Sequence, residues 1–253
     1  MKNETAIFLL AIQFLTRLPV PASHLYSPDR LNATPRYYPL VGLLLGGMSA
    51  AAFWSLNQML PLSIALLLTM MFGLLITGAF HEDGLADTFD GIGGGQDRES
   101  SLAIMKDSRL GTYGTTALML ALALKFASLM ALPEGWIVLA LIAGFALSRF
   151  SSVLVIATSR YARMEGKAKP VAEHLSAPSL IVGILTSLGA MGLVAYFGSV
   201  NALGAGCLGL VVGHFVMRLL FEGKLKGYTG DTLGAVQQAS EIGFYLGLNA
   251  WLS

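Results

Sequence analysis

The chain has 253 residues, of which 55% are hydrophobic and only 12% are charged, and its net charge is +1. A disordered chain needs low hydrophobicity and high charge, a disulfide scaffold needs paired cysteines where this chain has one, and a nucleic-acid-binding protein needs a basic surplus. A soluble domain would carry about twice this share of charged residues. The composition therefore predicts an all-α, polytopic membrane protein forming a single domain over residues 1–253.

Long apolar runs support this fold class. The first candidate, Thr5–Leu18, has only 14 residues and contains Gln13, so it either spans the membrane or lies in the interface. A spanning helix needs about 20 mostly apolar residues, and seven runs of about that length follow: Tyr37–Leu56, Leu60–Phe80, Tyr113–Leu132, Trp136–Thr158, Pro178–Phe197, Ala202–Phe221 and Leu233–Leu252. The sequence predicts a helical bundle of about seven or eight transmembrane segments.

The distribution of Lys and Arg predicts the orientation of this bundle. Basic residues fall in the segments before 37, from 81 to 112, from 159 to 177 and after 221, whereas the short connections 57–59, 133–135 and 198–201 contain none. All four basic loops share one side when the spans alternate. Loops rich in Lys and Arg are cytoplasmic in most membrane proteins. We therefore expect every sizeable loop, and any chemistry, at the cytoplasmic face.

The segment from His81 to Gly91 is the richest in acidic residues. If it is helical, Asp83, Asp87 and Asp90 lie within roughly 60° of one face. Carboxylates this close repel one another, and a divalent cation would relieve that repulsion; oxygen ligands favour Mg²⁺, Mn²⁺ or Ca²⁺ over Zn²⁺. With Glu82 beside them, they are the predicted metal ligands. The alternative interpretation is a solvated acidic segment at the membrane edge.

Glycines and basic residues follow the acidic segment. The backbone at Gly93 and Gly94 could approach an anion, as in phosphate-binding loops, or could form a flexible linker. Lys106 and Arg109 are typical phosphate donors, although they could equally be the positive flank of the next span. Asp107 adds a further carboxylate. Together with the acidic segment, these residues indicate phosphoryl transfer.

Other polar residues have two open interpretations each. Asp231 is either the N-cap of the last span or a contact to metal or phosphate. The basic segment from Arg160 onward either contacts an anionic substrate or fixes the topology. Within the spans, Arg149 and Arg218 are either functional or snorkel to the interface. Deeper in the bilayer, Lys125 and Glu241 are expected to pair with each other.

Several of these segments resemble the cobalamin synthase family, the adenosylcobinamide-GDP ribazoletransferases. The resemblance is carried by His81–Gly91 (HEDGLADTFDG), by Ile104–Gly114 (IMKDSRLGTYG) and by Gly230–Ala235 (GDTLGA). The opening segments Phe14–Pro21 and Arg36–Gly42 resemble it as well. The resemblance covers the whole chain. Within the family, the chain is similar to the enterobacterial form.

The resemblance implies a multi-pass enzyme of the cell inner membrane that depends on Mg²⁺, with Mn²⁺ as the alternative metal. Its expected substrates are adenosylcobinamide-GDP and α-ribazole or α-ribazole 5′-phosphate, and GMP is released. Lys106 and Arg109 would hold phosphates, with Asp231 and the two glycines nearby, and Asp90 or Asp107 would accept the attacking hydroxyl's proton. Membrane lipid and corrinoid-assembly proteins are expected partners, and nucleic acid is not.

Two other functions remain open on sequence grounds. The CDP-alcohol phosphotransferases share the beginning of Asp87-Thr88-Phe89-Asp90-Gly91, but the Ala-Arg pair of their signature is replaced here by Gly93-Gly94. A cation transporter would carry carboxylates near the bilayer midplane. In this chain the carboxylates cluster at one predicted membrane edge, and only Glu241 lies deep.

Overall fold

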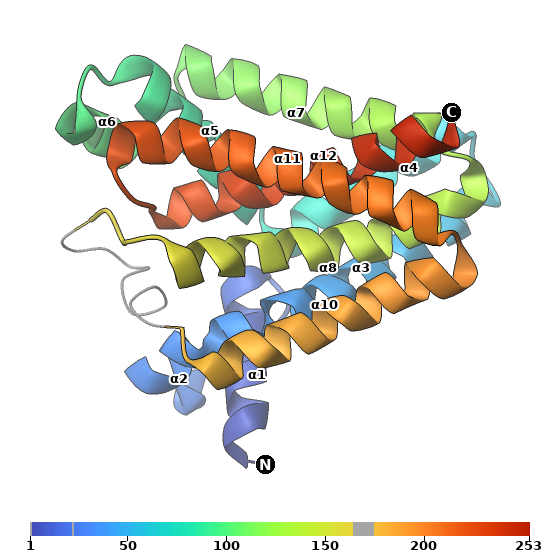
Figure 1. The fold of residues 1–253 in the computed structure, drawn as a ribbon, viewed down its shortest axis with the longest axis horizontal. Coiled ribbons are helices and arrows are strands. Elements are labelled where there is room, and N and C mark those ends of the chain that lie inside the picture. The colour runs from blue at the N-terminus through green and yellow to red at the C-terminus, as the bar shows by residue number, and fades with distance from the viewer. Residues whose placement is uncertain (1, 22, 164–174) are drawn as a thin grey trace.

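The computed structural model describes residues 2–21, 23–163 and 175–253, and this part of the chain is helical apart from one isolated β-bridge. The all-α prediction is confirmed. The helices, seen in Figure 1, are α1 (Lys2–Leu15), α2 (Pro28–Ala33), α3 (Tyr38–Asn57), α4 (Leu62–Thr77), α5 (Phe80–Gly94), α6 (Arg98–Ile104), α7 (Thr112–Ala131), α8 (Glu134–Thr158), α10 (Ala177–Phe197), α11 (Val200–Leu225) and α12 (Gly230–Leu252). Two short 3₁₀ turns, Ser23–Leu25 and Thr34–Tyr37, flank α2.

Five helical segments are long and apolar enough to cross a membrane: Pro28–Asn57, α7, α8, α10 and α11. A sixth is reached if α4 and α5 are counted as one bent span. By length and composition, the described helices thus offer five or six candidate spans, where about seven or eight were predicted. At 14 residues, α1 is too short to span alone. Although α12 has 23 residues, polar side chains in its middle, such as Gln237 and Glu241, lower its apolarity.

The predicted span Leu60–Phe80 is wrong in its last turn. The helix ends at Thr77, because Gly78 and Ala79 both adopt positive φ, at 65° and 55°. A left-handed residue cannot continue a right-handed helix, and α5 leaves at 86° to α4. We therefore regard α4 as the apolar, membrane-embedded part of this pair, and α5 as a helix outside the spans.

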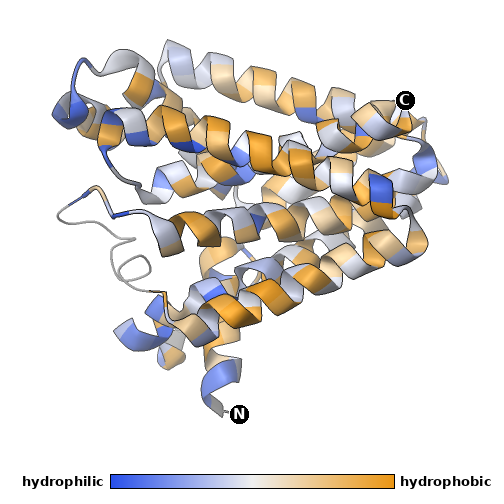
Figure 2. Ribbon diagram, in the orientation of Figure 1, coloured by the Kyte–Doolittle hydropathy of each residue, from blue (hydrophilic) through white to orange (hydrophobic). Residues whose placement is uncertain are grey.

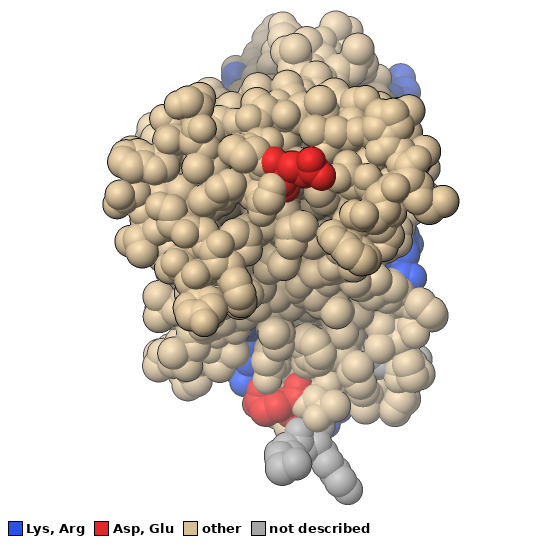
Figure 3. All heavy atoms as spheres, turned by 90° about the vertical axis from the view of Figure 1, so that its right-hand side faces the viewer, with Lys and Arg blue, Asp and Glu red and all other residues tan. Residues whose placement is uncertain are grey.

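The long helices α7, α8, α10, α11 and α12 run alongside one another in Figure 1, whereas α1 runs across them. The connections around α2, α6, Tyr161 and the α11–α12 turn gather at one end, as predicted, and the short turns lie at the other. Figure 3 looks onto the short-turn end, where few Lys and Arg show: they lie at the edges of the view and beside the lower red group. We call the first end the loop end. Its orientation toward the cytoplasm stays a prediction.

Burial separates the centre of the bundle from its lipid-facing surface. The spanning window of α8 is 67% buried, against 22% for α7, α10 and α11. Large apolar side chains such as Leu185, Leu208 and Phe215 are exposed on the outer helices, and Figure 2 shows these helices orange and white along most of their length. Such a surface suits hydrocarbon rather than water.

Candidate active site

The first turns of α5 and α12 meet at the loop end through two glycines. A Cβ on Gly84 would lie 2.6 Å from the backbone oxygen of Asp231, and one on Gly234 would lie 2.9 Å from that of His81. Only residues without a side chain allow the two backbones to come this close. The contact brings Asp83, at the start of α5, to the same place as Asp231, at the start of α12.

These two aspartates line a cavity of about 690 Å³. One wall is aromatic: Phe14 stacks on Tyr38 with ring centroids 6.1 Å apart and meets Phe80 edge-on at 5.5 Å. The charged lining residues come from five separate segments and are Asp83, Lys106, Arg149, Arg163 and Asp231. The cavity can therefore hold a ligand that is part planar and apolar, part anionic.

The carboxylates here are only partly neutralised. Asp231 accepts a hydrogen bond from Arg163 at 2.8 Å, and burial raises its pKa against the opposing effect of that arginine. Asp87 lies one turn from Asp83 and is half-buried; burial, together with repulsion from Asp83 and Asp231, raises its pKa to about 7. We call Asp83, Asp87, Lys106, Arg163 and Asp231 the loop-end site. A bound cation would relieve the repulsion among the three carboxylates of this site.

The donor set fits a substrate-bridged magnesium ion better than an all-protein metal cage. Among the described residues, no three His, Cys, Asp or Glu side chains are placed to hold a metal ion together. Mg²⁺ in nucleotide enzymes is usually held by one or two carboxylates, with substrate phosphates and waters completing its shell. Asp83 and Asp87, neighbours at i and i+4, meet that requirement.

The structure places Asp90 away from the cavity, which argues against its predicted catalytic and metal-binding roles. Its two carboxylate oxygens accept hydrogen bonds from the backbone N–H groups of Gly111, at 2.7 Å, and Gly114, at 2.8 Å. Asp90 thereby caps the N-terminus of α7 from a neighbouring helix. A Cβ on either glycine would collide with this carboxylate, which explains the spacing of the two glycines.

Glu82 also points elsewhere. It is buried, and its Oε1 accepts a hydrogen bond from the Gln238 amide at 2.9 Å in the interior of the bundle. Adjacent residues on a helix point about 100° apart, so Glu82 faces α12 while Asp83 faces the cavity. The prediction of Glu82 as a metal ligand alongside Asp83 is therefore not supported by its position.

The predicted phosphate-binding loop is helical, because α5 continues through Gly93 and Gly94. Asp107 and Arg109 form an exposed pair with each other at 2.5 Å, and 88% of the arginine side chain is exposed. Neither lines the cavity. Of the predicted substrate-binding residues, only Lys106 and Asp231 do so.

The predicted site residues include neither Arg149 nor Arg163. Arg163 reaches Asp231 because the chain around Tyr161 pairs with the α11–α12 turn: Ala162 N donates to Tyr228 O at 2.8 Å, and Tyr228 N donates to Arg160 O at 2.9 Å. The rest of that basic segment, with Lys167 and Lys169, lies outside the described residues. Arg149 does not snorkel: it is 2% exposed and lines the cavity.

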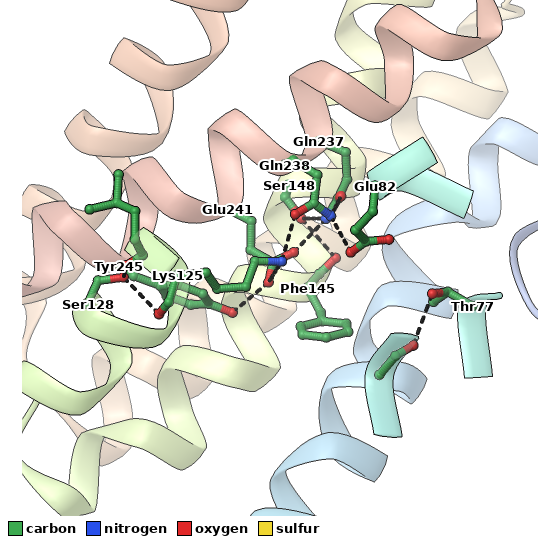
Figure 4. A network of polar contacts seen from close by, with 12 residues as sticks. Thr77, Glu82, Lys125, Ser128, Phe145, Ser148, Gln237, Gln238, Glu241 and Tyr245 are labelled. Atoms are coloured by element: carbon green, nitrogen blue, oxygen red, sulfur yellow. Dashed lines mark hydrogen bonds and ion pairs between the residues drawn. The ribbon is translucent and has the colours of Figure 1, made fainter. Parts of the chain in front are cut away.

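A second polar cluster lies deeper in the bundle and is shown in Figure 4. The predicted pair is confirmed, with Lys125 Nζ 3.2 Å from Glu241 Oε1. Lys125 also donates to Gln238 at 2.7 Å, and Gln237 donates to Glu241 at 2.6 Å. We call these residues and Glu82 the core network. It connects α5, α7 and α12 inside the bundle.

Comparison with known proteins identifies the family to which the chain belongs. The family model described as Cobalamin-5-phosphate synthase matches residues 7–249. The chain belongs to this family. A protein named adenosylcobinamide-GDP ribazoletransferase from Shewanella baltica (strain OS155) is 43% identical over 252 residues, covering 96% of this chain and 93% of the relative. One of the same name from Shewanella frigidimarina is 44% identical, covering 96% and 94%. No solved structure gives a significant match.

Membership of the cobalamin-5-phosphate synthase family confirms the resemblance drawn from the motifs. The match reaches from α1 into α12 and so includes every element that forms the loop-end site. The family found is the one that the three long motifs indicated, rather than the CDP-alcohol phosphotransferases or a cation transporter.

Proposed function

We propose that the chain is an adenosylcobinamide-GDP ribazoletransferase, a membrane enzyme that transfers the phospho-adenosylcobinamide group to α-ribazole or its 5′-phosphate and releases GMP. The observation that carries the proposal is the loop-end cavity, where carboxylates from α5 and α12 face Lys106 and Arg163. This arrangement suits a pyrophosphate substrate, and the relatives that align along 96% of the chain bear the same activity in their names.

The reaction is a substitution at phosphorus. A ribose hydroxyl oxygen of the acceptor forms a bond to the β-phosphorus of adenosylcobinamide-GDP. The bond from that phosphorus to the bridging oxygen breaks, and its electron pair leaves with GMP. The hydroxyl proton passes to a carboxylate of the site. Asp231 suits this role better than Asp90 or Asp107, because it lines the cavity and is held by Arg163 and Thr229.

The other residues bind and orient the pyrophosphate. Lys106 and Arg163 offer N–H donors to its oxygens, and Asp83 and Asp87 would hold Mg²⁺, or Mn²⁺, against it. The metal, when bound, neutralises pyrophosphate charge that would otherwise repel the entering oxygen. The excess of Lys and Arg in the loops supports a cytoplasmic location for this end of the bundle in the cell inner membrane. Corrinoid-assembly proteins are further proposed partners there.

The proposal is tested with purified protein in lipid vesicles, supplied with adenosylcobinamide-GDP and α-ribazole. We expect GMP release that requires Mg²⁺ and stops when the metal is chelated. Absence of GMP release from folded protein with both acceptors would overturn the proposed activity, and equal release without any divalent cation would overturn the metal role.

Single cysteines at Gln96 and Gly135, in a Cys207→Ser background, should label from the cytoplasmic and opposite sides, respectively.

A further inference from the structure

The inner end of the loop-end cavity is formed by Arg149. This residue is 2% exposed and lies on α8, one of the two most buried helices. Together with His81, it lines both the loop-end cavity and a small interior cavity of about 40 Å³ beside the core network. Arg149 and His81 therefore form the partition between the two spaces. Lys106 and Asp83 are exposed and lie at the outer end.

The Arg149 guanidinium has unused hydrogen-bonding capacity. One terminal nitrogen donates to Phe145 O at 2.9 Å, and the group lies over the Phe145 ring at 5.1 Å. Its Nε has no partner, and Arg149 forms no ion pair among the described residues. Glu82 and Glu241 line the small cavity, where they bond to Gln238 and Lys125, respectively.

Three other cavity-lining residues share this property. The hydroxyls of Tyr38 and Tyr161 and the Nε of Arg163 are also buried without a hydrogen-bond partner. A buried donor without a partner costs about 1–3 kcal/mol, and native structures rarely leave several in one place. Four such side chains, two of them cationic, around one cavity indicate a ligand rich in acceptor oxygens and negatively charged.

Size decides which anion reaches the inner end. Pockets of about 300–1,000 Å³ enclose drug-sized ligands, and this one has about 690 Å³. A corrinoid joined to a guanine nucleotide is far larger, so most of the donor substrate must stay outside. The acceptor, a nucleoside with an apolar bicyclic base, fits within. The aromatic wall of Phe14, Tyr38 and Phe80 offers that base a stacking surface.

We propose that the inner end of the cavity is the acceptor subsite, in which Arg149 binds the 5′-phosphate of α-ribazole 5′-phosphate while the aromatic wall contacts its base. This inference rests on the proposed function and adds to it the residue through which the phosphorylated acceptor binds more tightly than α-ribazole. On sequence grounds Arg149 is either functional or snorkels to the interface, and its place in the cavity favours the functional interpretation. A guanidinium matches a phosphate through paired N–H donors.

The test compares the two acceptors on the same protein. We expect Arg149→Gln to raise the KM for α-ribazole 5′-phosphate on the order of thirtyfold, as for loss of a charge-assisted hydrogen bond, and to raise the KM for α-ribazole much less. Arg218→Gln is the matched control, because Arg218 pairs with Glu222 on α11 and does not line the cavity. It should leave the ratio of the two KM values unchanged.

The other possible results of this comparison separate a failure of the acceptor subsite from a failure of the proposed function. An equal loss with both acceptors, or a raised KM for the corrinoid substrate alone, overturns the acceptor role of Arg149, as does an unchanged ratio. Wild-type protein that releases no GMP with either acceptor fails the proposed function instead. The acceptor subsite would then still be decided by calorimetric binding of α-ribazole 5′-phosphate and α-ribazole to wild type and Arg149→Gln.

A measurement on the unmutated enzyme covers the case in which Arg149→Gln does not fold. Inorganic phosphate should inhibit wild-type turnover competitively with α-ribazole 5′-phosphate. Competition against adenosylcobinamide-GDP alone would place the anion at the donor pyrophosphate and overturn the proposal. Arg149→Lys, which keeps the charge but loses the paired donors, should weaken the phosphorylated acceptor's binding by less than the Gln variant does.

Discussion

The loop-end site and the core network share the helices α5 and α12 and differ in how their charges are balanced. In the core network, Lys125 and Glu241 pair directly, and glutamine amides bond to both glutamates. In the loop-end site, Asp83 and Asp87 have no cation within ion-pair distance among the described residues, and only Asp231 has an arginine.

This difference distinguishes polar groups that stabilise the fold from polar groups that are available to bind a ligand. Buried charges that are neutralised within the protein hold helices together and leave little for a ligand to do. Carboxylates that repel one another, beside a cavity with unpaired cationic donors, are relieved by a bound cation or by a proton, and such groups are typical of functional sites. Glu82 and Asp83, adjacent on α5, point about 100° apart: Glu82 accepts a hydrogen bond from Gln238 inside the bundle, with its second carboxylate oxygen buried and without a partner, whereas Asp83 lines the cavity. The predictions below test that division.

Breaking the core network should have the largest effect. Lys125→Met leaves Glu241 buried without its cation, which costs about 3–5 kcal/mol for a buried ion pair. We expect a marked fall in the thermal unfolding midpoint in detergent micelles, partly restored in the double variant Lys125→Met/Glu241→Gln. Lys226→Met, at an exposed lysine, is the control. Wild-type stability in the single variant would show that the pair contributes nothing.

Removing the unbalanced carboxylates should leave the fold intact but stop the chemistry. Asp83→Asn and Asp87→Asn should each lower kcat about a hundredfold or more, roughly 3 kcal/mol, as for loss of an electrostatic group in a phosphoryl-transfer site. Glu82→Gln is the matched control: it keeps the acceptor for the Gln238 amide and should lose far less activity. GMP release per folded molecule is the measurement. Equal losses in all three variants would contradict the division.

The contact between Asp90 and α7 should contribute to the stability of the fold and not to catalysis. In Gly114→Ala the new Cβ would collide with the Asp90 carboxylate and the Ala86 backbone oxygen, and overpacking of this kind costs about 1–3 kcal/mol. Gly135→Ala, where a Cβ meets nothing within 4 Å, should be neutral. Thermal unfolding measures both. A stable Gly114→Ala protein that has lost its activity would return Asp90 to the catalytic residues.

The smallest expected effect is a pH dependence of metal binding. The pKa of Asp87 is raised to about 7, so below pH 7 this carboxyl holds a proton that Mg²⁺ must displace. Each further unit of acidity should weaken apparent metal affinity up to about tenfold. The Mg²⁺ concentration giving half-maximal GMP release should therefore rise between pH 7 and pH 6 and be constant above pH 8. Identical values at pH 6 and pH 8 would show that Asp87 does not bind the metal.

The sequence by itself determined the helices and the family, because both are written in local patterns. Apolar runs predict some helix ends to within one residue, as for Tyr113–Leu132 against Thr112–Ala131 in the structure. Other ends differ by up to four residues, as for Phe221 against Leu225 at the end of α11. Basic residues predicted that the loops share one end, and the deep charges Lys125 and Glu241 were paired correctly because few ionisable groups can be partners inside a membrane. The acidic and basic motifs predicted the family directly.

Only the tertiary structure decided which polar groups face one another. The 86° turn after α4 depends on positive φ at Gly78 and at Ala79, and an alanine carries no sequence mark of that conformation. Arg163 and Asp231 are 68 positions apart and meet only because Tyr161 pairs with Tyr228. Asp90 shares a helical stripe with Asp83 and Asp87, yet it caps α7. Helical spacing fixes the direction of a side chain, whereas its partner is set by the packing of helices distant in sequence.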